Sequence, residues 1–335
     1  MTKLKTKEKP KIAIGTLIQW YEVEIIPEYV ESLVNAIEYR ESYDTLYLDF
    51  EIYSGTMLEK PIPEISISEL VKRINNTLQI ISDRFPNINI YVNVVDRLRT
   101  IADYRRDFNA VFCTIADVLV WGESDMLVPK EFFTSIDAIH SLEQKDSKYI
   151  ATFAITKMWD SSWKSLEHPT VKDKEFIDGD TENWWSVRYT MSLSELYEIN
   201  RKEELFSVTK INPIKFNGCG LVISSELVKS GVNIPSSIFF VHEDTAFMLM
   251  CQRMFPQLSQ YHFANILLAH NRKHPNKRSY ILGEGGIDKT NIGALRKTHD
   301  WYPIANKFCE TNCHNLFNPN YKAYTWNDVF SKIQH

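Results

Sequence analysis

The stretch "DVLVWGESDMLVP", residues 117–129, joins a short apolar run to two carboxylates that are one residue apart, Glu123 and Asp125. The run has the length and composition of a buried strand, and the acids follow where that strand ends. Side chains alternate along an extended chain, so Glu123 and Asp125 project to the same side. The pair suits a divalent cation; the alternative interpretation is a solvated acidic turn before a helix that starts after Pro129.

Upstream of this stretch, strand-like and helix-like patterns alternate. Apolar runs predict strands at 11–18, 44–52, 87–95 and 117–121. Helical spacing of apolar residues predicts helices at 25–40, 67–85 and 101–116, and Ser68 is expected to cap the second of them. Strands separated by helices are typical of a parallel sheet with both faces covered. We therefore predict an α/β fold, with a mostly parallel central sheet flanked by helices.

The remainder of the chain continues this alternation less regularly. Helices are expected at 130–143, 191–205 and 244–255, and strands at 148–158, within 211–228 and up to about residue 270. The segment 159–190 holds Trp159, Trp163, Trp184 and Trp185 with little periodicity. From about residue 300 the chain is aromatic and irregular. The predicted organisation is a disordered basic lead-in (1–10), one domain with a variable segment (11–300), and an extension packed on it (301–335).

Composition sets limits on the class of protein. The 335 residues are 44% hydrophobic, enough for a large core, and the net charge of −5 gives no global argument for binding nucleic acid. No apolar run approaches the roughly 20 residues that span a bilayer, and the N-terminus lacks the apolar part of a secretory signal, so a cytoplasmic protein is expected. The five cysteines are an odd, scattered set. They are expected to be reduced and buried, although "CETNCH" at 309–314 has the spacing of half a zinc site.

A second polar cluster is "FFVHEDTAF", residues 239–247, in which Glu243 and Asp244 open a predicted helix. Acids are favourable at a helix start because of capping and the helix dipole. The functional interpretation is that one of these carboxylates is a general base facing a pocket. The sequence of this cluster leaves both interpretations open.

A third cluster is "LLAHNRKHPNKR", residues 267–278, where an apolar strand leads into a basic loop. It contains His270, Arg272, Lys273, His274, Lys277 and Arg278. Imidazoles with basic side chains suit a pyrophosphate and its metal, or the loop is a solvated run of charge. Residues 270–298 carry seven Lys and Arg against two acids, a patch that could also follow the phosphate backbone of DNA.

Taken in order, these clusters resemble a known family. An acid-x-acid turn is followed by the glycine-containing "FNGCGLVIS" (216–224), by "HEDTAF" (242–247), and by a strand that ends in histidine. This order resembles the GT-A-fold nucleotide-sugar glycosyltransferases over residues 11–275. Residues 123–125 look like their DxD motif and residues 243–244 like their Glu-Asp motif.

The resemblance implies a divalent cation, Mn²⁺ or Mg²⁺, and a nucleoside-diphosphate sugar as donor. Asp125 and His270 would bind the cation. Glu123 departs from the family pattern by replacing the first acid of the DxD motif, and it would still contact the metal or the nucleotide of the donor. Asp244, or else Glu243, would be the base in an inverting transfer to an acceptor hydroxyl. Residues 11–128 would form the nucleotide-binding half and residues 129–300 the acceptor half.

The resemblance also implies a set of donor-binding residues. Arg106 and Asn109 lie on the helix before the DxD strand, and Gly218 and Gly220 would allow close backbone approach. Further candidates are Thr16, Tyr21, Asp96 (or Asp49), Arg272 and Lys273. The acceptor would be a glycan, a lipid-linked or protein group, or a hydroxylated base in DNA, and the Trp-rich segment is a place where it would stack.

Two other functions are compatible with the same residues. One is a nucleotidyltransferase, which also combines an α/β sheet with acidic metal ligands; the single glycine in "IAIGTLIQW" (12–20) counts against its usual glycine-rich loop. The other is a non-catalytic protein that binds a nucleotide sugar.

Overall fold

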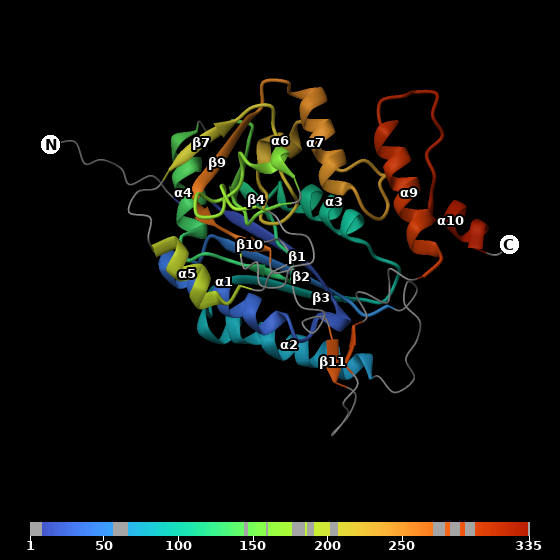
Figure 1. Ribbon diagram of the computed structural model, residues 1–335. Helices are drawn as coiled ribbons and strands as arrows, with labels where there is room; N and C mark the ends of the chain where they lie inside the picture. The colour runs from blue at the N-terminus through green and yellow to red at the C-terminus, as the bar shows by residue number, and fades with distance from the viewer. Residues whose placement is uncertain are drawn as a thin grey trace.

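The central feature of the computed structural model is a sheet of eight strands in the order β3-β2-β1-β4-β8-β6-β9-β7 (Figure 1). The structure describes residues 9–55, 66–143, 147–158, 160–175, 185, 191–201, 207–270, 279–281, 289–291 and 299–333. The strands are β1 (Ile12–Gln19), β2 (Leu46–Tyr53), β3 (Asn89–Val95), β4 (Val118–Trp121), β6 (Tyr149–Ala154), β7 (Val208–Ile211), β8 (Val222–Ser224) and β9 (Ser259–Leu267).

Most of the strands run in one direction. β1 pairs in parallel with β2 and β4, β2 with β3, and β6 with β9. β8 is antiparallel to both β4 and β6, and β7 is antiparallel to β9. The predicted α/β fold with a mostly parallel sheet is confirmed.

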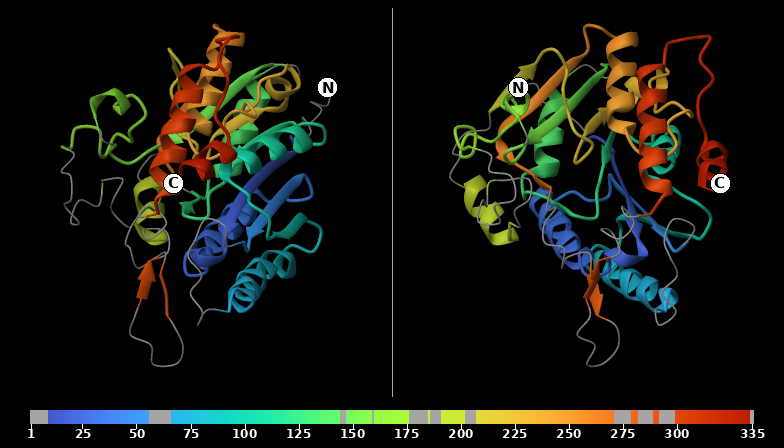
Figure 2. Two further views of the ribbon diagram at one scale, coloured as in Figure 1. Left: turned by 90° about the vertical axis from the view of Figure 1, so that its right-hand side faces the viewer. Right: turned by 45° about the vertical axis from the view of Figure 1, so that its right-hand side comes forward.

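Helices cover both faces of the sheet (Figures 1 and 2). They are α1 (Ile26–Arg40), α2 (Ile67–Arg84), α3 (Ile101–Phe112), α4 (Phe132–Leu142), α5 (Leu193–Arg201), α6 (Ser225–Lys229), α7 (Glu243–Met254), α9 (Trp301–His314) and α10 (Trp326–Ile333). Two short pairs of strands complete the described fold. They are β5 (Met126–Leu127) with β10 (Ala269–His270), and β11 (Ser279–Ile281) with β12 (Lys289–Asn291).

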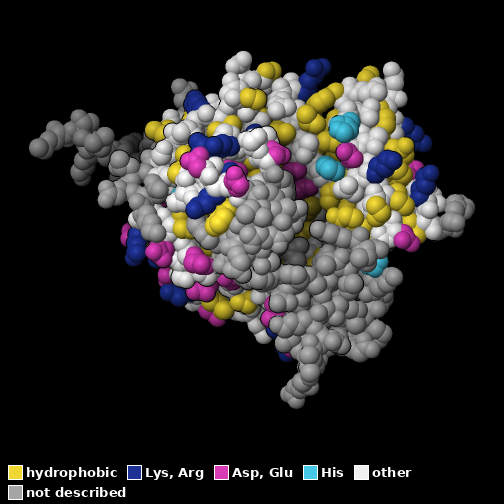
Figure 3. Space-filling view, viewed as in Figure 1, with side chains coloured by type: hydrophobic (Ala, Val, Ile, Leu, Met, Phe, Trp, Pro, Cys, Tyr) yellow, Lys and Arg dark blue, Asp and Glu magenta, His cyan; other side chains and the backbone are white. Residues whose placement is uncertain are grey.

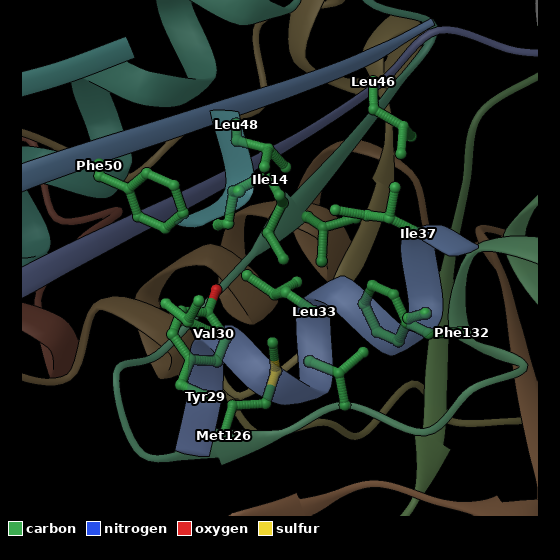
Figure 4. Close-up of a cluster of buried hydrophobic side chains, with 14 of the residues drawn as sticks. Ile14, Tyr29, Val30, Leu33, Ile37, Leu46, Leu48, Phe50, Met126 and Phe132 are labelled. Carbon is green, nitrogen blue, oxygen red and sulfur yellow. The ribbon is translucent and has the colours of Figure 1, made fainter. Parts of the chain in front are cut away.

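Alternation along the strands divides the apolar side chains between two cores. Ile12 and Ile14 of β1 join the core beneath α1, α2 and α4, whereas Ala13 joins the core beneath α3, α6 and α7. Figure 4 shows the first core, where Leu33 and Ile37 of α1 meet the β1 and β2 side chains. Because every residue of the central strands β4, β6 and β8 is buried, the sheet needs helices on both faces.

The structure corrects two local expectations. The cap of α2 is Ser66, whose side chain accepts a hydrogen bond from the Glu69 backbone N–H, and Ser68 lies inside the helix. Residues 301–333 are also more regular than expected, because they contain the helices α9 and α10. Trp301, Ala305 and Cys309 recur at a spacing of four and bury one face of α9 against Phe239, Phe240 and Val329.

All five cysteines are buried thiols outside any disulfide, as predicted. Within the described residues, no helix is both long enough and apolar enough to cross a bilayer.

Candidate active site

The candidate site lies where the strand order of the sheet changes direction. β2 and β3 continue the sheet on one side of β1, whereas β4 lies on its other side. In open α/β sheets, ligands bind outside the carboxyl ends of the strands at such a switch point. The segments that follow β1 and β4 therefore reach the same space.

A cavity of about 630 Å³ opens at this edge. Its lining includes Tyr21, Glu22, Arg105, Glu123, Asp125, Trp163, Lys215, Gly218, Cys219, Glu243, Asp244 and His270. Acidic side chains are visible in a hollow near the middle of the face seen in Figure 3. The cavity brings together residues from all three polar clusters of the sequence.

A short pairing of strands explains why residues distant in sequence meet. β5 follows Asp125 directly and pairs antiparallel with β10, so that His270 lies opposite Met126. As a result, His270 Nε2 lies 2.8 Å from Glu123 Oε2 and 3.2 Å from Asp125 Oδ1. The two carboxylates thus converge on one imidazole, as their alternation along the chain predicts, and Asp125 is only 2% exposed.

Glu22 holds the acidic turn in place, and sequence reasoning missed it. Glu22 Oε2 accepts hydrogen bonds from Ser124 Oγ at 2.7 Å and from the Gln19 backbone N–H at 2.9 Å. The turn itself is closed by the Met126 backbone N–H, which donates to Glu123 O at 3.0 Å. Residues 123–125 are therefore fixed to the segment after β1, so their carboxylates are held in position.

Arg105 connects the acidic turn to the start of α7. Its Nη2 lies 2.7 Å from Glu123 Oε1, and its Nη1 lies 2.6 Å from Glu243 Oε1. Nη2 also donates to Gly218 O at 3.1 Å, and the guanidinium lies over the ring of Trp121. Arg105 is buried, so its charge is the main counter-ion for both carboxylates.

Arg106, the residue predicted from the sequence, lies elsewhere. Its guanidinium donates to the backbone carbonyls of Ile234, Pro235 and Ile238 and pairs with Asp103. The buried face of α3 passes through Ala102, Arg105 and Asn109, so the helical phase points Arg105 inward and Arg106 away from that face. The helical spacing of Ala102, Arg105 and Asn109 was therefore the sequence signal that could have identified Arg105 as the inward-facing arginine.

The Arg105 bridge leads to a prediction about stability. Arg105→Met is expected to lower the free energy of unfolding by about 3–5 kcal/mol, because it leaves the buried carboxylate of Glu243 without its counter-ion and removes one partner of Glu123. Burial raises the pKa of Glu243 to about 7, and Arg105 opposes that rise. Glu243 is thus protonated in the folded state below this pH, and the loss should be smaller below pH 7 than above it. Urea unfolding at both pH values measures the difference.

Two further variants test this explanation. Adding Glu243→Gln to Arg105→Met should recover part of the loss, because it removes one of the unpaired charges. Arg84→Met removes a more exposed pair with Glu38 and should cost no more than about 1 kcal/mol. Equal losses for the two arginine variants would show that burial of the bridge is unimportant.

The start of α7 presents two acids in different environments. His242, just before the helix, adopts a left-handed conformation (φ 65°), and Glu243 is buried against Arg105. Asp244 also lines the cavity but is less buried, and its Oδ1 accepts from the Thr245 backbone N–H at 2.7 Å. Asp244 is therefore the more accessible carboxylate of the pair.

Several other predicted donor residues do not line this cavity. Thr16 is buried, with its Oγ1 2.7 Å from Tyr29 Oη, and Asn109 bonds to the indole N–H of Trp121 and to Asn233. Asp96 is exposed after β3. Asp49 accepts a hydrogen bond from Tyr104. Among the described residues, these side chains are occupied by contacts within the protein or point to solvent, so their positions do not support donor binding.

Of the remaining predicted residues, Tyr21 and Gly218 line the cavity, and Gly220 does not. A side chain added at Gly218 would meet Arg105, and one added at Gly220 would meet Leu268. The predicted basic loop and part of the Trp-rich segment lie outside the described residues. This applies to Arg272, Lys273, His274, Lys277, Arg278, Arg296, Lys297, Trp159 and Trp184. Lys289 is described only as part of the backbone of β12.

One wall of the cavity, formed by Trp163 and Lys215, carries an aromatic side chain. Trp163 is half-buried, and Lys215 Nζ lies 4.4 Å from the centroid of its ring. Lys215 is fixed in turn by Ser162, to whose carbonyl oxygen it donates at 2.9 Å. This wall combines an apolar ring face with a positive charge.

Comparisons with known proteins give matches among solved structures only. No family model matches the chain, and no curated protein matches it by sequence. It is similar to a mannosyltransferase from Pyrobaculum calidifontis in complex with GDP-Man and Mn²⁺, at 10% identity and a TM-score of 0.47, over 97% of this chain and 70% of that one.

Two further solved structures are similar at the same level. S. aureus TarS (residues 1–349) matches at 11% identity and a TM-score of 0.41, over 92% of this chain and 72% of that one. GalNAc-T7 with UDP, GalNAc and Mn²⁺ matches at 9% identity and a TM-score of 0.45, over 98% of this chain and 55% of that one. Because these identities and scores are low, we base the function proposed below on the residues of the site. These three structures are therefore reported only as what the chain is similar to.

Proposed function

We propose that this chain is a metal-dependent glycosyltransferase that moves a sugar from a nucleoside-diphosphate sugar to an acceptor hydroxyl. The observation that supports this most is the convergence of Glu123, Asp125 and His270 with the Glu243–Asp244 helix start in one cavity. Metal ligands on one side of a pocket and an accessible carboxylate on another are what such a transfer requires.

Asp125 and His270 would hold the cation, Mn²⁺ or Mg²⁺, with Glu123 beside them. The donor set fits, because carboxylate oxygens and an imidazole nitrogen already meet within hydrogen-bonding distance of one another. Asp125 matches the last acid of the DxD motif, and Glu123 Oε1 is also bonded to Arg105, so Asp125 is assigned to the cation first. When bound, the cation would neutralise the diphosphate and the charge that develops as it leaves.

Asp244 would be the general base. The acceptor oxygen forms a bond to the anomeric carbon, the bond from that carbon to the diphosphate oxygen breaks, and Asp244 takes the proton of the acceptor hydroxyl. Attack opposite the leaving group inverts the configuration at the anomeric carbon. Glu243 is less suited to this role because its carboxylate is buried and bonded to Arg105.

Trp163 and Lys215 would contribute to acceptor binding. The half-buried indole of Trp163 would stack on a sugar ring or a nucleobase, and the ammonium of Lys215 beside it favours a polar or anionic acceptor. This wall supports each of the predicted acceptor classes, from a glycan to a hydroxylated base in DNA.

A binding experiment tests the donor site without knowledge of the acceptor. Thermal unfolding is measured with a panel of nucleoside diphosphates, each with and without Mn²⁺. One diphosphate is expected to stabilise the chain only when Mn²⁺ is present, by about 2.7 kcal/mol at about 100 times its Kd. Chelation of the metal should reverse the effect, and the parent nucleoside should not reproduce it.

Turnover is then measured as diphosphate released from nucleotide sugars carrying that base. Release of a diphosphate together with transfer or hydrolysis of the sugar supports the proposal. If no diphosphate stabilises the chain in a Mn²⁺-dependent manner, the donor site is refuted. Binding without turnover of any donor would indicate a non-catalytic protein.

A further inference from the structure

A thiol lies in the part of the cavity where the carboxylates of Glu123 and Asp125 meet the imidazole of His270. Cys219 Sγ, a carboxylate oxygen of Glu123 and a ring nitrogen of His270 all lie within 4.8 Å of one another. Cys219 is 8% exposed and lines the cavity itself. Oxygen, nitrogen and sulfur donors therefore meet at one point.

The backbone on both sides of Cys219 fixes this position. A side chain at Gly218 would overlap the guanidinium of Arg105, which is itself bonded to Glu123. Gly220 has φ +69°, and a Cβ there would lie 2.6 Å from Cδ1 of Leu268, two residues before His270. The Cys219 backbone N–H donates to Asn217 Oδ1 at 3.1 Å. The two glycines thus let Cys219 sit between the acidic turn and the strand that carries His270.

The same thiol also faces a small space behind the site. A cavity of about 10 Å³ is lined by Cys219, His270, Leu268 and neighbouring residues. A space of this size is close to the smallest that holds one water molecule. Ligands around Zn²⁺ lie about 2.0–2.3 Å from the metal, which places them closer together than the 4.8 Å limit observed here.

We propose that Cys219 is a ligand in the cation site and gives this site a preference for Zn²⁺ over Mg²⁺. The inference rests on the cation of the proposed function, and it adds a residue and a selectivity to that site. Thiolate is a soft ligand that selects Zn²⁺, whereas Mg²⁺ takes oxygen ligands. On binding, the thiol loses its proton to solvent and sulfur donates to the metal. The ligands would then be an oxygen from Asp125 or Glu123, a nitrogen from His270 and the sulfur of Cys219.

The test uses Co²⁺ as a probe on the full chain. A Co²⁺ ion bound by thiolate gives a sulfur-to-metal charge-transfer band in the near ultraviolet, and this band should rise with binding and disappear when Zn²⁺ is added. Cys219→Ser should lose the band. Its Zn²⁺ affinity should fall at least about tenfold, while its Mg²⁺ affinity changes less than about twofold. The control is Cys113→Ser, because Cys113 is a buried thiol at the end of α3 and does not line the cavity. This variant should keep the charge-transfer band and the Zn²⁺ affinity of the unaltered chain.

The outcomes separate this inference from the proposed function. If Co²⁺ binds, as measured by calorimetry, but the band is absent, Cys219 is no ligand and the cation site itself stands. If no divalent cation binds, both the inference and the metal-dependent function fail.

A second measurement needs no variant, in case Cys219→Ser does not fold. Alkylation of Cys219 by iodoacetamide, followed by mass spectrometry, should be slowed by Zn²⁺ in the unaltered chain. An unchanged rate at saturating Zn²⁺ overturns the inference.

Discussion

Asp125→Asn is expected to reduce Mn²⁺-dependent release of nucleoside diphosphate by at least about 10³-fold. The substitution keeps the size of the side chain but removes the negative charge of the carboxylate that we assign to the cation. A bound metal contributes several kcal/mol of transition-state stabilisation, and about 1.36 kcal/mol corresponds to a tenfold change in rate. Steady-state turnover at several Mn²⁺ concentrations measures the loss, and calorimetry shows whether Mn²⁺ binding is lost with it.

The control for this variant is Asp44→Asn. Asp44 is exposed in the turn before β2, at the amino end of the strands and away from the cavity. Asp44→Asn makes the same chemical change as Asp125→Asn and should leave both turnover and Mn²⁺ binding unaltered. Wild-type turnover in a folded Asp125→Asn variant would remove Asp125 from the metal site.

Asp244→Asn is expected to lower turnover by about 10²–10⁴-fold, the usual contribution of a positioned general base. Because Asp244 is not among the side chains that meet at His270, binding of Mn²⁺ and of the nucleoside diphosphate should stay close to that of the unaltered chain. The decisive comparison is therefore between kcat and the affinity for donor, measured by turnover and by calorimetry on the same preparation.

A structural role for Asp244 gives a different result. The residue is in the first turn of α7, where an acid stabilises the helix by about 0.3–1 kcal/mol. Asp328→Asn makes the same change in the first turn of α10, outside the cavity, and reports the effect of losing a helix-start acid. If Asp244→Asn weakened donor binding as much as turnover, the capping role would be the better explanation.

Periodicity accounts for how much of the fold could be predicted from the sequence. The strands from β1 to β4 and the helices between them were predicted within a few residues, because their apolar patterns are long and regular. The helices α9 and α10 were not predicted. In α9 the buried face carries Trp301, Ala305 and Cys309, a set too mixed in size and polarity to stand out as a helical stripe.

The site residues that follow strand ends could be predicted from the sequence. The residue whose orientation is set by its position around a helix could not. Glu123, Asp125 and His270 follow apolar strands, and strand ends meet at one edge of a sheet. Arg105 and Arg106 are adjacent, and only the phase of α3 decides which of them faces the cavity. Cys219 gave no signal of its own, because its proximity to His270 arises from the packing of a loop between two glycines.

The pairing of β5 with β10 has a consequence for the behaviour of the whole chain. Asp125 and His270 belong to the two ends of a segment longer than a hundred residues, and this short ladder helps to hold them side by side. A cation bound by both would act as a reversible cross-link that closes this long loop, and such closures restrict the unfolded chain most when the loop is long. Metal binding would then report on assembly of the two halves as well as on catalysis, and an isolated N-terminal half would have no complete site.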